Sequence, residues 1–191
     1  PGDYKYEDWN GDGEINGQDE HPFAFDQTPW LQFSLNAGLQ WKNFDFNMLL
    51  QGSALGSMEY KEPLHEIWGK NGGALTQFLD RWHPVDPKAD PYDPSTVWTS
   101  GHYAYTGRWA KNNSAFNRVS TAYLRLKSIE LGYTFPKLKQ IPNASLRVYA
   151  NAYNLLTFTG VKFVDPEHPD DDLGRMYPLN KTYTLGVSLS F

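Results

Sequence analysis

The sequence predicts an all-β fold whose strands belong to an antiparallel transmembrane barrel, and three observations support this prediction. First, residues 182–191 alternate without an error between apolar and small or polar side chains, which is the pattern of a strand with two different faces. Second, other segments repeat this pattern over about ten residues, the length with which a tilted strand crosses a bilayer. Third, the connections between these segments are alternately long and short, as in outer-membrane barrels.

The composition excludes several classes of protein. No run of about 18 apolar residues exists, and the mean hydropathy of -0.61 argues against a helical membrane protein, although alternating strands cancel in such an average. Cysteine is absent, and the net charge of -5 without a basic stripe makes nucleic acid an unlikely partner. The five histidines are dispersed and interpreted as surface loop residues; without a nucleophile motif, the chain is not expected to be an enzyme.

Residues 1–28 are expected to form an extracellular loop that carries an EF-hand-like motif. Calcium takes six to eight oxygen ligands, and an EF-hand loop supplies them from alternate positions around a glycine at position 6, here Gly13. The shorter Asp19 stands where the usual ligand is Glu. We therefore predict calcium binding, against the alternative of a turn cluster that binds nothing. The candidate ligands are Asp8, Asn10, Asp12, Glu14 through its carbonyl, Asn16 and Asp19.

Residues 29–54 are expected to form a transmembrane hairpin. The odd positions from Leu31 to Trp41 are apolar, and after a short turn at Lys42 and Asn43 the alternation resumes from Phe44.

Residues 55–120 break all periodicity and are expected to form a long extracellular loop. Sugar faces stack on aromatic rings while their hydroxyl groups need polar neighbours, and this loop supplies both. The alternative is that the rings pack a small core of the loop or face a lid protein. The candidate substrate or lid contacts are Trp68, Trp82, Trp98, Tyr103, Tyr105, Arg108 and Trp109.

Residues 121–158 are expected to form a second transmembrane hairpin, residues 159–180 an acidic extracellular loop, and residues 181–191 the closing strand. In the first strand of this hairpin, Leu124 and Leu126 are out of phase with Ile129. Either a bulge corrects the register or the upper part of this strand rises above the membrane. Five strands are fewer than the eight of the smallest single-chain barrels, so we expect a longer barrel of which this chain is the C-terminal part.

Several stretches together resemble the C-terminal end of a SusC/RagA-type TonB-dependent transporter of the Bacteroidota outer membrane. The matching stretches are GD at 2–3 leading into DWNGDGEI at 8–15, then TP at 28–29, YLRLKSIELGYTFP at 123–136, LRVY at 146–149, NLLTF at 154–158, VDPE at 164–167, YP at 177–178 and TYTLGV at 182–187. The end of the chain also resembles the signal by which outer-membrane assembly machinery recognises its clients, read as Thr184, Gly186, Leu189 and Phe191.

The resemblance implies a barrel of 22 strands in the full protein, an N-terminal plug, energy supplied by TonB through segments that this chain lacks, and a SusD-like lipoprotein that covers the mouth. It implies import of an oligosaccharide across the outer membrane, with lipid around the barrel, and peptide import is the rival within the family. From a different class, the alternative is a soluble calcium-stabilised β-sandwich that binds carbohydrate.

Overall fold

The computed structural model describes residues 2–65, 73–105, 114–136, 144–168 and 176–191. Its regular elements are strands, with three short 3-10 helices, η1 (Gly17–Asp19), η2 (Glu62–Leu64) and η3 (Thr76–Leu79), among the described residues. The predicted all-β fold is therefore confirmed.

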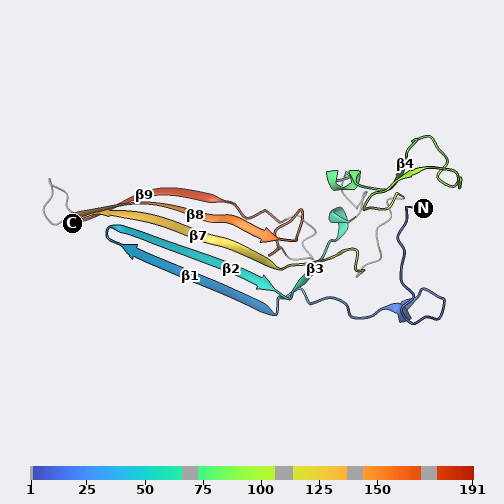
Figure 1. The fold of residues 1–191 in the computed structure, drawn as a ribbon, viewed down its shortest axis with the longest axis horizontal. Coiled ribbons are helices and arrows are strands. Elements are labelled where there is room, and N and C mark those ends of the chain that lie inside the picture. Colours follow the sequence, from blue (N-terminus) through green and yellow to red (C-terminus); the bar gives the residue numbers. More distant parts are fainter. Residues whose placement is uncertain (1, 66–72, 106–113, 137–143, 169–175) are drawn as a thin grey trace. The chain divides into compact units, whose positions relative to one another are not determined.

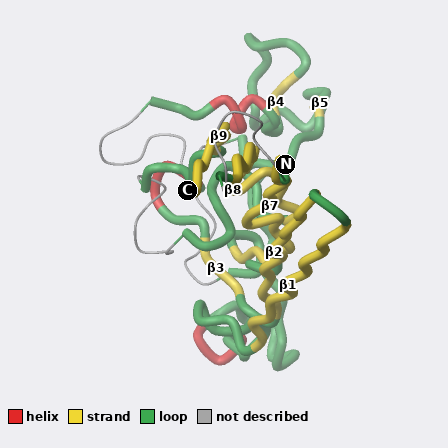
Figure 2. Tube along the Cα trace, turned by 90° about the vertical axis from the view of Figure 1, so that its left-hand side faces the viewer, coloured by secondary structure: helices red, strands yellow, loops and turns green. Residues whose placement is uncertain are grey.

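Five long strands form one antiparallel sheet in the order β1-β2-β7-β8-β9 (Figure 1). They are β1 (Leu31–Trp41), β2 (Phe44–Ala54), β7 (Tyr123–Phe135), β8 (Ser145–Thr159) and β9 (Thr182–Ser190). Short strands form two smaller sheets, in which β3 (Ser57–Glu59) pairs with β6 (Arg118–Ser120) and β4 (His83–Pro84) with β5 (Trp98–Thr99). The tube in Figure 2 shows the five long strands as adjacent yellow segments.

The chain divides into two compact units. Unit 1 contains residues 1–24, 58–119 and 169–175, and unit 2 contains residues 25–57, 120–168 and 176–191. Unit 2 therefore carries the five-stranded sheet, and unit 1 carries the calcium motif together with most of the aromatic segment.

A two-residue turn sets the register of β1 and β2. Trp41 pairs with Phe44 across Lys42 and Asn43, and Lys42 takes a φ of 53°, a conformation that tight hairpin turns require. Because directly paired residues share a face, this register puts the apolar positions of β1 beside those of β2.

A bulge in β7 brings its two halves into phase. Leu49 of β2 pairs with Ser128 and Leu50 with Leu126, so Lys127 is the extra residue. Leu126 and Ile129 consequently lie on the same face although they are three positions apart. The bulge, one of the two alternatives left open by the sequence, is confirmed.

The register makes one face of the sheet apolar from edge to edge. One row across it consists of Leu39, Phe46, Leu131, Ala150 and Leu185. Leu39 is 64% exposed and Leu185 is 78% exposed, so no second layer of this chain's described residues covers this face. A soluble sandwich would bury such a face between two sheets, and the observed arrangement therefore argues against the sandwich alternative.

The opposite face is polar and carries an ion-pair network. Arg147 of β8 donates to both carboxylate oxygens of Asp45 on β2, and its Nη2 also lies 2.6 Å from Glu130 on β7. The network crosses Gly132, where a Cβ would come within 2.5 Å of an Asp45 oxygen. Glycine at this position therefore leaves the space in which Arg147 reaches across three strands.

Candidate functional site

The predicted calcium motif forms a closed loop held by its own carboxylates. Asp8 accepts hydrogen bonds from the backbone N–H of Gly11 at 2.7 Å and of Gly13 at 2.8 Å. Asp19 accepts from Trp9 and Asn16, both within 2.9 Å, and thereby joins the two ends of the loop. Gly11 and Gly13 have φ of 76° and 85°, the left-handed conformation that such a turn needs.

The remaining candidate ligands make short local bonds. Asp12 accepts from the N–H of Glu14 at 2.7 Å, and Asn16 caps η1 by accepting from Gln18 at 2.8 Å. Asp8 and Asp19 are half-buried, and the other candidate ligand residues are exposed. Among the described residues, no three His, Asp or Glu side chains converge closely enough to hold a metal ion. The loop is thus held closed by hydrogen bonds from backbone N–H groups to its carboxylates.

The described part of the aromatic segment packs into a small core of its own in unit 1. Phe78 and Tyr103 are buried, with ring centroids 4.7 Å apart in an edge-to-face arrangement, and Phe116 packs against them. Burial raises the pKa of the Tyr103 hydroxyl. Tyr103 is only 8% exposed and is therefore closed to a stacking ligand in this conformation.

Three other residues of the predicted set lie next to one glycine. Trp82, Trp98 and Tyr105 all line Gly2, and the rings of Trp98 and Tyr105 lie 5.0 Å apart. Each of the three is half-buried, so part of each residue remains open to solvent. The structure therefore brings three of the predicted contact residues together at Gly2 and places Tyr103 in the core with Phe78. Trp68, Arg108 and Trp109 lie outside the described residues.

The interpretation of all five histidines as surface residues is wrong for two of them. His65 and His168 are each 6% exposed. The rings of His21 and His102 instead stack on aromatic neighbours, Trp9 and Phe116. Local sequence did not reveal this burial, because both buried histidines lie in segments without periodicity.

A buried arginine that the sequence analysis did not single out anchors the segment after β8. Arg125 is 1% exposed and donates to Glu167 at 2.5 Å, to Asp165 at 2.6 Å and to Thr157 at 3.1 Å. The sequence signal for this site was a charged residue between Leu124 and Leu126 in a predicted strand. Such a charge needs partners of opposite charge when it is buried.

The positions of the predicted assembly signal lie on or next to β9. Leu189 pairs with Leu146 on the apolar face, whereas Thr184 pairs with Asn151 on the polar face. Gly186 lies under the ring of Tyr149, and Phe191 is 96% exposed.

The part of the chain that the structure describes contains no helix with the length and apolar character needed to cross a membrane.

The comparisons with known proteins agree on one class. No family model matches the chain. The chain is 30% identical to the TonB-dependent receptor P26 and 28% identical to the TonB-dependent receptor P3, both from Formosa agariphila, over its whole length in each case. It is 26% identical, over 96% of its length, to the TonB-dependent receptor SusC of Bacteroides thetaiotaomicron.

The solved structures of the RagAB peptide importer share the fold. The chain in the open-open state superposes with a TM-score of 0.63 over 93% of the present chain at 23% identity, and a second RagAB structure gives 0.63 over 94% at 21% identity. The present chain covers 19% and 20% of those chains and between 17% and 20% of the curated relatives.

The exposed apolar face, the polar opposite face and these likenesses define a portion of an outer-membrane receptor barrel. The chain is a homologue of TonB-dependent receptors, SusC among them, and its location is the outer membrane. These relatives are receptors rather than enzymes.

Proposed function

We propose that the chain is part of a transporter that imports oligosaccharides across the outer membrane in partnership with a SusD-like lipoprotein, with energy supplied by TonB. The observation that carries this proposal is the likeness to TonB-dependent receptors over the whole chain, SusC among them, joined to a sheet with one exposed apolar face. Lipid contacts the apolar face, and the remainder of the barrel and the plug complete the transporter.

The aromatic segment supports a glycan as substrate. Trp82 and Trp98 are only partly buried, and polar side chains such as Arg81 and Asp80 lie beside Trp82 in the sequence. A neutral polyhydroxylated ligand favours such rings with hydrogen-bonding neighbours. Peptide import is the rival, because solved structures of the RagAB peptide importer share this fold.

Growth of the source organism on separate glycans and peptides tests the proposal. We expect removal of residues 60–113 from the receptor to slow growth on one or more glycans and to leave growth on peptides unchanged. The control is the amount of receptor assembled in the outer membrane, which must equal that of the parent. A defect confined to peptides would replace the glycan proposal by its rival, and unchanged growth on every nutrient would remove this segment from substrate recognition.

We also propose that calcium binds the loop of residues 8–19, and the donor set fits this ion. Three carboxylates, two amide oxygens and the carbonyl of Glu14 are hard oxygen ligands of the kind that calcium prefers. Each carboxylate oxygen that accepts one backbone hydrogen bond has a second lone pair for a cation. Bound calcium would order an extracellular segment and take no part in transport chemistry.

Substitution within this loop should separate ligand side chains from the backbone ligand. We expect Asp12→Ala and Asp19→Ala each to lower calcium affinity about tenfold or more, because each removes a carboxylate from the set. Glu14→Gln is the matched control, because that position contributes its carbonyl, and it should change affinity by less than about threefold. The measurement is calcium-dependent hydrogen-exchange protection of the backbone amides of residues 8–19 in the full receptor. Absence of saturable protection at millimolar calcium would contradict the proposal.

A further inference from the structure

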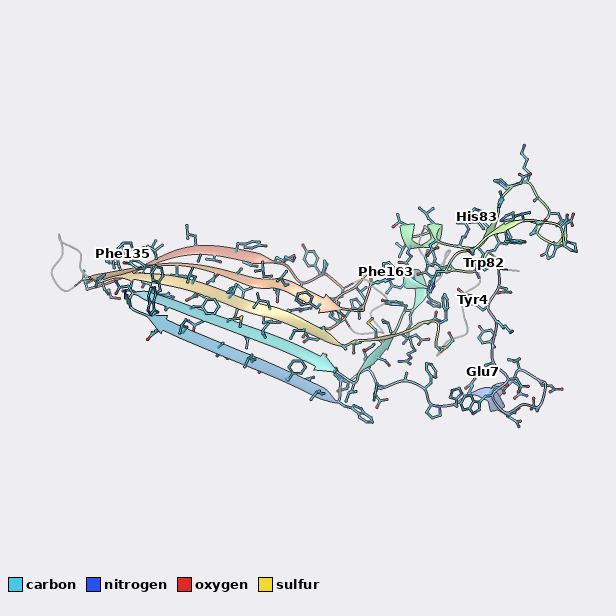
Figure 3. All side chains as sticks on the ribbon, viewed as in Figure 1. Tyr4, Glu7, Trp82, His83, Phe135 and Phe163 are labelled. Carbon is cyan, nitrogen blue, oxygen red and sulfur yellow. The ribbon has the colours of Figure 1, made fainter. Side chains whose placement is uncertain are left out.

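Residues 2–6 pass through the aromatic part of unit 1. The carbonyl of Gly2 accepts a hydrogen bond from the backbone N–H of Tyr105 at 2.7 Å, across more than one hundred positions of sequence. Further along the same segment, the ring of Tyr4 packs edge-on against Phe116 with centroids 4.7 Å apart. Figure 3 shows Tyr4 and Trp82 in this part of the molecule.

The contact at Gly2 favours a glycine. Gly2 has a φ of 75°, and a Cβ added there would come within 3.1 Å of the Cβ atoms of both Trp82 and Tyr105 and within 3.4 Å of the Trp98 ring. Both the backbone conformation and the close approach therefore oppose any side chain. Three aromatic residues from separate parts of the segment consequently meet on one backbone unit.

The contact at Tyr4 joins the same segment to the core of unit 1. A hydrogen bond from the Ala104 backbone reaches the Tyr4 hydroxyl, and burial raises the pKa of that group. The ring of Phe116, on which Tyr4 packs, also lies 6.0 Å from that of Tyr103 between centroids and is stacked with His102. Tyr4 thus contacts Phe116, while Gly2 contacts Trp82, Trp98 and Tyr105.

The aromatic segment has little regular structure to fix these rings. Its described hydrogen-bonded elements near Trp82 are η3, the short β4–β5 pair and a bridge between Arg81 and Tyr103. The N–H of Trp82 donates to the carbonyl of Tyr103 at 2.9 Å, and Tyr105 follows Tyr103 by two positions. Movement of Tyr105 away from Gly2 would therefore also loosen the backbone contact of Trp82.

We propose that residues 2–6 form a strap that positions Trp82, Trp98 and Tyr105, with Gly2 as the backbone unit that the three residues approach and Tyr4 as the second anchor. The strap leads directly into the loop of residues 8–19, so the aromatic segment and that loop form one folded unit. The positions of candidate recognition rings are therefore set by a segment that precedes them by about 80 to 100 residues in sequence. The role of these rings in recognition rests on the proposed function, whereas the strap itself does not.

Hydrogen exchange in the full receptor tests the strap. We expect Gly2→Val to speed exchange of the Tyr105 and Trp82 amides about tenfold or more, because these amides lose the packing around Gly2. Gly17→Ala is the matched control, because a Cβ there meets nothing within 4 Å and its φ is not positive, and it should leave both amides unchanged. Tyr4→Leu is a milder second variant, and it should speed exchange at Tyr103 and Tyr105 without affecting β1 and β2.

Gly2→Val and Tyr4→Leu test the strap independently, so one variant still gives a result where the other impairs assembly of the receptor. Exchange of the Tyr105 and Trp82 amides within twofold of the parent in both assembled variants would overturn the strap. Faster exchange in the loosened variants with unchanged uptake of every glycan and peptide would support the strap and remove the rings from substrate recognition. Failure of the strap and failure of the proposed function are therefore distinguishable.

Discussion

Replacing both Asp165 by Asn and Glu167 by Gln is expected to destabilise the segment of residues 160–168 by about 3 kcal/mol, because Arg125 would keep its charge while losing both carboxylates. Arg125 is 1% exposed, so water cannot replace these partners. The value lies at the low end for a broken buried pair, because Asp165 and Glu167 remain 22% and 36% exposed. Hydrogen exchange of the His168 amide, which donates to the carbonyl of Asp165, measures the effect.

Arg125→Met provides the control for this prediction. Removing the buried charge together with its need for partners should cost less than removing the partners, because an apolar side chain of similar length can fill the site. Combining Arg125→Met with both carboxylate substitutions should therefore recover part of the stability lost in the double variant. Equal destabilisation by the double variant and by Arg125→Met alone would contradict the view that an unpaired buried charge causes the effect.

Leu35→Arg is expected to destabilise the membrane-inserted receptor by about 2–4 kcal/mol, whereas Asn36→Arg should cost about 1 kcal/mol or less. Both residues lie near the middle of β1, but Leu35 pairs with Leu50 on the apolar face and Asn36 pairs with Leu49 on the opposite face. A guanidinium on the lipid side loses its hydration, while the same group on the polar side keeps it. Denaturant titration of the receptor in phospholipid vesicles gives the two free energies of unfolding.

Strand β9 offers a second pair for the same comparison. Val187 pairs with Val148, and Ser188 pairs with Arg147. Val187→Arg should lower the free energy of unfolding more than Ser188→Arg does. Ser188→Arg would also bring a like charge opposite Arg147, so it is a weaker control than Asn36→Arg. Equal losses for Leu35→Arg and Asn36→Arg would show that the two-face assignment is wrong.

The alternation of side chains determined the strands. From Leu31 to Trp41 every second residue is apolar, and a one-residue change of register would move this whole set to the other face, so the pattern specifies both strand and facing. The short turn at Lys42 and Asn43 then fixes the first hairpin. In β7 the alternation left two alternatives open, because Leu124 and Leu126 are out of phase with Ile129. Only the pairing with β2 placed the extra residue at Lys127.

The contacts made by segments without periodicity could be identified only from the tertiary structure. Residues near Trp82 carry no repeat that ties them to Gly2, and nothing local to Arg125 selects Asp165 and Glu167, which lie 40 and 42 positions away. Such contacts form because chain connections outside the sheet bring distant side chains together, and a buried charge or a ring then selects its partners by geometry. The sequence by itself therefore determined the sheet and its two faces, whereas the tertiary structure decided which loop residues meet.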